Sequence, residues 1–194
     1  MGRQPSTSVA ELSHVALQLF TERGFAETTV DDIATACGIS RRTFFRYFPS
    51  KNDLPWGDFD ALVERMRRHL HDTPQEVPLV DALREAVIEF NRFPPGEIED
   101  HRLRMSLLLN VPTLVAHSTL RYASWRQAIA EYAARRLRVP EDDMHPQVIA
   151  WATLAASLSA YEQWLKHEGA DLPTLLRTAF DVLGTTFSGQ HAKP

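Results

Sequence analysis

The amino-acid sequence predicts an all-α protein of nine helices, with a small N-terminal domain followed by a larger helical one. Three observations predict this fold class. Apolar residues recur at the helical spacing i, i+3, i+4, i+7 over almost the whole chain, glycine and proline interrupt them at short intervals, and no stretch alternates as a strand would. We place the boundary between residues 1–52 and residues 53–194.

The first three helices are expected to be short and to occupy about residues 12–23, 30–37 and 40–48. Gly24 and Gly38 follow the first two helices as C-terminal stops. Six longer helices with short connections are expected behind them. They cover about residues 53–70, 79–90, 97–109, 112–137, 146–167 and 171–187.

Proline near the start of the fourth helix complicates its N-terminus. The ring of Pro55 would clash with the carbonyl group four residues earlier if the helix continued through it. We therefore expect this helix to restart near Asp53 or to kink there.

The bulk composition is that of an ordinary globular protein, with 44% apolar and 24% charged residues and a net charge of −4. Any DNA-binding charge must therefore be concentrated locally. The single cysteine, Cys37, cannot form an internal disulfide, which fits a reducing cytoplasm. We recognise no signal peptide and no stretch of the roughly 20 apolar residues that span a bilayer. We expect a cytoplasmic protein without membrane association.

Residues 30–48 form the most informative segment, because two short helices flank the turn Cys37-Gly38-Ile39. A tight turn with a glycine between two short helices is the helix-turn-helix pattern, whose second helix can lie in the major groove of DNA. Thr29 and Asp32 have the spacing of a capping box, although with Asp in place of the usual Glu or Gln. Cys37 is interpreted as a small turn residue without a redox role.

The second of these helices has two distinct faces. At about 100° per residue, Arg42 and Arg46 project together, whereas Phe44 and Phe48 project to the opposite side. The aromatic face can pack on the preceding helix, and the guanidinium groups can bind guanine or phosphate. An arginine pair on a short helix can also be no more than a solvated face.

Basic charge is concentrated between residues 40 and 51, where no acidic residue occurs. The basic residues of this stretch are Arg41, Arg42, Arg46 and Lys51. Such a cluster in a net-acidic chain is the local patch that DNA binding needs. Thr29 and Ser40 lie where backbone N–H groups at helix starts can bind phosphate, and Arg3 can add a contact from an N-terminal arm. Phe45 and Tyr47 can either pack inward or lie against the sugar-phosphate backbone.

The run LF…GF…TTVDDIA…CGIS…TFFRYFPSK…L over residues 19–54 resembles the TetR family signature, which covers about a quarter of the chain. The resemblance implies all-helical homodimers with three N-terminal DNA-binding helices. By position, Arg42 and Thr43 resemble base-contacting residues of the family. The positions that resemble phosphate-contacting ones are Thr29, Ser40, Phe45, Tyr47 and Lys51.

This sequence departs from the family pattern at two positions. Phe45 replaces a more common tyrosine, which removes a hydroxyl group that could bind phosphate, and Pro55 is unusual so early in the fourth helix. The segments FRYFPSKNDLPWGDFD and EFNRFPP also resemble a narrower group, the regulators of mycofactocin biosynthesis clusters in actinobacteria. That resemblance implies a long-chain fatty acyl-CoA as effector.

Residues 148–161 carry no charge and are rich in alanine and serine, so neighbouring helices can approach this helix closely. The eighth and ninth helices can form half of a four-helix homodimer seam, as the resemblance also implies. The alternative is a helix buried only within its own subunit. A dimer suits a palindromic operator, because two recognition helices then follow one two-fold axis.

Large apolar and aromatic side chains on the middle helices are candidates to line an effector pocket, although most can equally be ordinary core. They are Trp56, Phe59, Met66, Phe90, Phe93, Met105, Leu108, Tyr122, Trp125, Trp151, Tyr161 and Trp164. The phosphates of an acyl-CoA would need basic groups, for which the candidates are Arg102, Arg104, Arg121 and Arg126. Each of these arginines can instead be a solvated surface residue.

The sequence argues against an enzyme. The eight histidines show no metal-binding spacing, there is no glycine-rich phosphate loop, and Cys37 has no evident base beside it, so we expect no catalytic residue, no metal and no cofactor. The predicted function is a repressor of transcription that binds an operator in double-stranded DNA and is released when a small-molecule effector shifts the fourth helix. A protein that binds DNA without sensing any ligand is the alternative.

Overall fold

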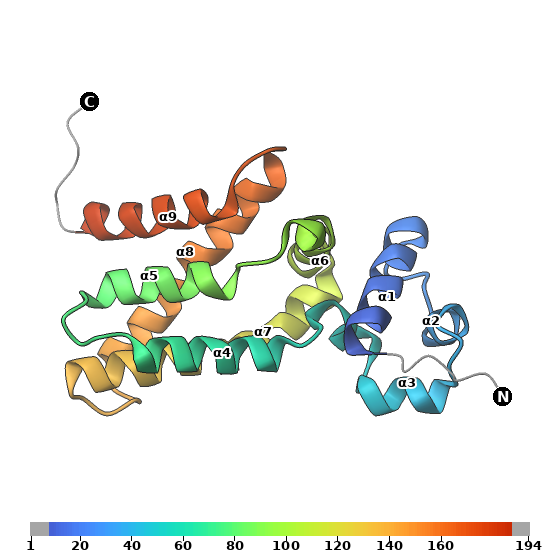
Figure 1. Cartoon of the computed structure of the whole chain (residues 1–194), viewed down its shortest axis with the longest axis horizontal. Helices are drawn as coiled ribbons and strands as arrows, with labels where there is room; N and C mark the ends of the chain where they lie inside the picture. The colour runs from blue at the N-terminus through green and yellow to red at the C-terminus, as the bar shows by residue number, and fades with distance from the viewer. Residues whose placement is uncertain (1–7, 188–194) are drawn as a thin grey trace. The chain divides into compact units, whose positions relative to one another are not determined.

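The computed structural model describes residues 8–187, and the regular elements in that range are all helical (Figure 1), which confirms the all-α fold class. Nine α-helices and two 3-10 turns follow one another in these residues. They are α1 (Val9–Arg23), α2 (Val30–Ala36), α3 (Arg41–Tyr47), η1 (Lys51–Trp56), α4 (Phe59–Asp72), α5 (Leu79–Phe90), η2 (Pro95–Glu97), α6 (Ile98–Asn110), α7 (Pro112–Leu137), α8 (Met144–Lys166) and α9 (Leu172–Phe187).

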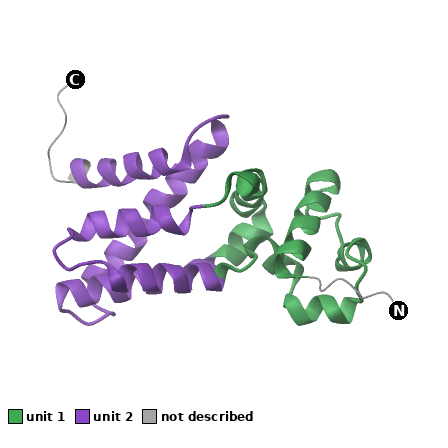
Figure 2. Ribbon diagram, viewed as in Figure 1, with its two compact units in different colours: residues 1–59, 93–118 green, residues 60–92, 119–194 purple. Residues whose placement is uncertain are grey.

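The chain folds into two compact units, shown in different colours in Figure 2. The N-terminal unit contains described residues 8–59 and 93–118, and the C-terminal unit contains residues 60–92 and 119–187. The helix α6 therefore belongs to the same unit as α1, α2 and α3, although it follows them only after α4 and α5 in the sequence. The expected boundary at residues 52 and 53 stays a prediction.

In the N-terminal unit, α1 contacts α2, η1 and α6, and α2 contacts α3. Leu12, Ile33 and Phe44 are completely buried at the centre of these contacts, as the apolar stripes of the sequence predict. A polar contact joins α1 to η1, where the buried Ser13 hydroxyl donates to the Leu54 carbonyl oxygen at 3.1 Å. The three short helices thus share one apolar core with η1 and α6.

The start of α4 differs from the expectation. The segment that contains Pro55 forms the separate 3-10 turn η1, and α4 begins only at Phe59 instead of near Asp53. Gly57 lies between the two elements with a φ of 54°, in the left-handed region that favours glycine. The break therefore depends on the glycine as well as on the proline.

In the C-terminal unit, α9 contacts α8 and α5, and α5 lies between α4 and α9 (Figure 1). Met66, Ile129, Leu176 and Phe180 are among its fully buried side chains. No helix in residues 8–187 has the length and hydropathy to cross a bilayer.

Candidate nucleic-acid interface and effector site

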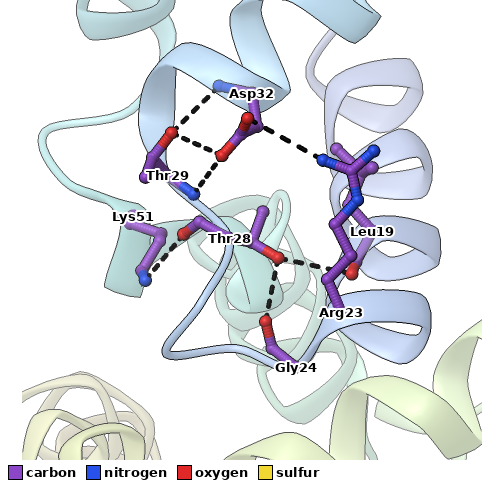
Figure 3. A network of polar contacts seen from close by, with 7 residues as sticks. All are labelled: Leu19, Arg23, Gly24, Thr28, Thr29, Asp32 and Lys51. Carbon is purple, nitrogen blue, oxygen red and sulfur yellow. Dashed lines mark hydrogen bonds and ion pairs between the residues drawn. The ribbon is translucent and has the colours of Figure 1, made fainter.

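The N-terminus of α2 is fixed by a reciprocal cap, the predicted capping box (Figure 3). The Thr29 hydroxyl oxygen accepts a hydrogen bond from the Asp32 backbone N–H at 3.1 Å, and the Asp32 carboxylate accepts one from the Thr29 backbone N–H at 2.8 Å. The bonds from the Thr29 side chain and backbone lower the pKa of Asp32. Asp therefore replaces Glu in this cap without loss of either hydrogen bond.

The turn and cap before α3 also follow the prediction. Gly38 has a φ of 64°, which a residue with a side chain rarely adopts. Ser40 is the N-cap of α3, and its hydroxyl oxygen accepts a hydrogen bond from the Thr43 backbone N–H at 3.1 Å. The hydroxyl groups of Ser40 and Thr43 are also hydrogen-bonded to each other at 2.9 Å.

The two faces of α3 are those that helical geometry predicts. Phe44 and Phe48 are only 0% and 3% exposed, whereas Arg42 and Arg46 are exposed on the other face. Phe45 is 44% exposed, and its ring meets that of Phe44 edge to face. Tyr47 is half-buried. The outer face of α3 thus presents arginine and aromatic side chains together.

The arginines of α3 differ in their contacts within the chain. Arg41 donates to the Asp31 carboxylate at 2.9 Å, and the Arg46 guanidinium lies 5.2 Å from the centre of the Tyr47 ring. Among residues 8–187, Arg42 has no hydrogen-bond or ion-pair partner. Its guanidinium group is consequently available to another molecule without the loss of an internal contact.

Lys51 has a role that the sequence did not reveal. Its ammonium group donates to the carbonyl oxygens of Phe25 at 2.7 Å and Thr28 at 2.9 Å, with Ala26 at 3.5 Å, and it lies 4.4 Å from the centre of the Phe25 ring. An ammonium group has three donors, so these carbonyl groups can use all of them. Partial burial lowers the pKa of Lys51.

Thr28 extends this network, as Figure 3 shows, and nothing in the local sequence pattern predicted its contacts. Its side chain is completely buried, and its hydroxyl group approaches the carbonyl oxygens of Gly24 at 2.8 Å and Leu19 at 3.3 Å. The loop between α1 and α2 is therefore tied to the end of α1 by Thr28 and to η1 by Lys51. These ties position Thr29 at the start of α2.

The predicted effector residues are divided between the two units. In the N-terminal unit, Trp56 and Phe59 meet edge to face with ring centres 4.9 Å apart. The other three of that unit are Phe93, Met105 and Leu108, of which Met105 and Leu108 are buried. The members in the C-terminal unit are Met66, Phe90, Tyr122, Trp125, Trp151, Tyr161 and Trp164.

Aromatic contacts connect several members of the C-terminal unit. The rings of Phe90 and Trp125 are 6.3 Å apart, and the hydroxyl group of buried Tyr161 is hydrogen-bonded to the side chain of buried Asn91. Burial raises the pKa of Tyr122 to about 12, so this phenol is neutral at physiological pH. These side chains form polar and apolar core in the described chain, and their contact with an effector stays a prediction.

Trp151 differs from the other predicted effector residues, because 54% of it is exposed. The Arg126 guanidinium lies over its ring at 3.6 Å from the ring centre. Of the other candidate arginines, Arg121 lies 3.4 Å from the Asp60 carboxylate. Arg102 and Arg104 are half-buried on α6.

Trp151 belongs to an exposed stripe along α8. Met144, Val148 and Trp151 recur at helical spacing, and each is more than half exposed. Ala155 and Ser159 continue the same stripe with small exposed side chains. The helix α8 thus leaves one apolar side open in the single chain.

No group of three or more histidine, cysteine or acidic side chains in residues 8–187 is arranged to hold a metal ion. Burial, followed by the charge of Glu11, raises the pKa of the Cys37 thiol, which disfavours a reactive thiolate. The expected contact of Arg3 lies outside the described residues.

Family comparisons agree with this architecture. The family described as bacterial regulatory proteins, tetR family, matches residues 12–54, and the MftR C-terminal domain matches residues 77–188. The mycofactocin biosynthesis transcriptional regulator MftR of Mycobacterium tuberculosis is 45% identical over 184 residues, which cover 95% of this chain and 93% of that protein. The regulator TcmR of Streptomyces glaucescens is 29% identical over 95% of this chain and 86% of its own length.

Solved structures show the same fold. FadR from Bacillus subtilis in complex with stearoyl-CoA superposes with a TM-score of 0.63 at 13% identity, over 89% of this chain and 95% of that one. FadR from Thermus thermophilus in complex with lauroyl-CoA superposes with a TM-score of 0.58 at 24% identity, over 96% of each chain. At these identities the likeness concerns the fold alone.

Proposed function

Because this chain belongs to the TetR family and is a DNA-binding transcriptional regulator similar to MftR, we propose that it is a homodimeric repressor of a palindromic operator, released by an apolar effector. The observation that supports operator binding most directly is the exposed position of the Arg42 side chain. It lies on the exposed face of α3, opposite buried Phe44, and has no partner within residues 8–187. Its guanidinium fork suits a bidentate contact with guanine in the major groove.

We assign base contacts to Arg42 and Thr43, with the second held in place by Ser40. The residues proposed to contact phosphate or the sugar-phosphate backbone are Thr29, Ser40, Arg41, Phe45, Arg46 and Tyr47. The intramolecular bonds of Lys51 favour a positioning role over a direct one for that residue. Since a bacterial operator lies in the cytoplasm, a cytoplasmic location is part of the proposal.

The proposed dimer uses α8 and α9. Its support is the exposed apolar stripe of Met144, Val148 and Trp151, together with Val182 on α9, which is 55% exposed. An apolar surface of this kind on a helix pair suits a four-helix seam around a two-fold axis. A symmetric dimer would present two copies of α3 to the two halves of a palindrome.

The proposed effector is a long-chain acyl-CoA. Its support is the resemblance to mycofactocin regulators, the 45% identity to MftR, and the presence of stearoyl-CoA and lauroyl-CoA in two structures with the same fold. We propose no catalytic activity, since the relatives are transcriptional regulators. A protein that binds DNA without sensing a ligand is the competing function.

Fluorescence anisotropy tests the proposal with labelled DNA from upstream of the protein's own gene, at fixed salt, with and without oleoyl-CoA. We expect tight binding that oleoyl-CoA releases. Tight binding that no tested acyl-CoA alters would retain the regulator and reject the effector. If the protein does not bind this DNA, and operator selection from random sequence yields no preferred site either, sequence-specific binding is rejected.

A further inference from the structure

The C-terminal unit contains a cavity of about 340 Å³ between the last turns of α4 and the second half of α7. No predicted effector residue lines it. The lining residues from α4 are Arg67, Arg68, Leu70, His71 and Asp72, and those from α7 are Ala128, Glu131 and Arg135. The cavity is thus mostly charged at its rim, and it has an apolar floor of buried Leu70 and Ala128.

Part of this charge is neutralised within the chain. Arg67 forms an ion pair with Glu131 across the cavity and lies 3.3 Å from the Glu64 carboxylate. The carboxylate of Asp72 lies 3.1 Å from the His71 ring. The pair of Arg67 and Glu131 joins α4 to α7, and the two acidic side chains of the lining each have a partner of their own.

Two arginines of the lining remain without a carboxylate partner among residues 8–187. Arg68 has no polar partner there, and Arg135 has only the Tyr132 ring, 5.8 Å from its guanidinium carbon. The charge of Arg67 is cancelled by Glu131, so the net charge of the lining depends on Arg68, Arg135, His71 and Asp72. It is about +1 when the His71 ring is neutral, and about +2 when a protonated His71 cancels the charge of Asp72.

We propose that this cavity binds a small phosphate monoester, with its phosphate group between Arg68 and Arg135 and its apolar part on Leu70 and Ala128. A phosphate monoester carries a charge of about −1.5 to −2 at neutral pH and has three acceptor oxygens, which match two guanidinium forks. The volume is near the lower end of the range of about 300–1,000 Å³ for small-molecule sites. The site is separate from α3 and from the proposed effector residues, so it does not rest on the proposed function.

Isothermal titration calorimetry of the full-length protein without DNA tests this site, with phenyl phosphate as the probe. We expect saturable binding of one phenyl phosphate per chain. Inorganic phosphate should bind more weakly because it lacks the apolar part, and phenol should not bind. Equal binding of benzoate would show a site for aromatic anions in general and overturn the phosphate assignment.

The variant Arg68→Ala/Arg135→Ala should weaken phenyl phosphate binding about ten-fold or more, because each lost charge-assisted contact contributes on that order. Arg92→Ala is the matched control, since it removes an exposed arginine of the same unit, one that pairs with Glu89 at 2.7 Å. Undiminished binding by the double variant, an equal loss in Arg92→Ala, or no binding by the wild type at millimolar phenyl phosphate would each overturn the proposal.

The double lysine variant Arg68→Lys/Arg135→Lys guards against a folding defect, because it keeps both charges while it removes the planar forks. We expect it to unfold at the wild-type temperature and to bind phenyl phosphate with intermediate affinity. Operator affinity in the absence of phenyl phosphate should be unchanged in every variant. Absence of phenyl phosphate binding would therefore not contradict the proposed repressor function. Absence of operator binding would likewise not contradict the phosphate site.

Discussion

The ammonium nitrogen of Lys51 lies 2.9 Å from the carbonyl oxygen of Thr28, so the first residue of η1, shortly after α3, holds the loop in front of α2. Thr29, the next residue, caps α2. The helix-turn-helix is therefore fixed from both of its ends by one side chain. By its position in the family motif, Lys51 is predicted to contact a DNA phosphate. Its N–H donors are instead engaged inside the protein.

Substitution of Lys51 distinguishes these two roles. Lys51→Met keeps much of the packing on Phe25 and removes the three bonds, and we expect a loss of about 1–3 kcal/mol in the free energy of unfolding. Operator affinity should fall while the slope of log K against log salt stays unchanged. A slope reduced by about 0.9 would instead show that Lys51 neutralises one DNA phosphate.

Arg42→Ala should have the opposite pattern. Because Arg42 is exposed and has no partner in residues 8–187, we expect its removal to leave the unfolding temperature unchanged. Base preference at one operator position should relax by about 1–3 kcal/mol, measured by anisotropy with operators mutated one base pair at a time. Unaltered preference at every position would contradict the assignment. Arg41→Ala is the control, which should weaken binding to all these operators alike.

The sequence predicted the elements that depend on local periodicity and local hydrogen bonds. The two faces of α3 follow from helical geometry, and the cap of α2 follows from the spacing of Thr29 and Asp32. The break before α4 was predicted less well. Pro55 signalled it, but its position depends on Gly57, whose positive φ a periodicity argument does not detect.

Contacts between residues distant in sequence could not be predicted. Lys51 binds carbonyl groups more than twenty residues earlier, and backbone carbonyls leave no trace in the residue types. The aromatic residues of the middle helices were equally ambiguous, since a core and a pocket need the same side chains. Trp151 illustrates this, because its ring is half exposed under Arg126.

The exposed apolar stripe of α8 predicts the effect of a charge at the proposed dimer interface. Val148→Asp places an unpaired carboxylate in the middle of the exposed apolar side of α8, where burial in a dimer would cost several kcal/mol. Sedimentation equilibrium should show a dimer for the wild type and a monomer for the variant. The monomer should bind a full palindrome with much lower affinity.

Leu120→Asp is the matched control, because Leu120 is 73% exposed on α7. We expect this variant to remain a dimer with unchanged operator affinity. Dissociation by Leu120→Asp and not by Val148→Asp would move the interface from α8 to α7.

We expect His101 to make the free energy of unfolding depend on pH. Burial, followed by the charge of Arg104, lowers its pKa to about 3, and its ring stacks on Phe93 with centres 3.9 Å apart. In the unfolded chain an ordinary histidine has a pKa of about 6.5. Above that pH both states are neutral at this ring. Below it the unfolded state binds a proton that the folded state does not, so the free energy of unfolding falls by about 1.4 kcal/mol per pH unit until the pH approaches 3.

Urea denaturation at pH 7, 6 and 5 measures this loss. His101→Gln removes the titrating ring and leaves every other histidine and carboxylate in place, so the difference between the two proteins isolates His101. We expect the wild type to lose about 2 kcal/mol more than the variant between pH 7 and pH 5. Parallel curves for the two proteins would mean that His101 is protonated as readily in the folded state as in the unfolded one, and hence that α6 does not bury it in solution.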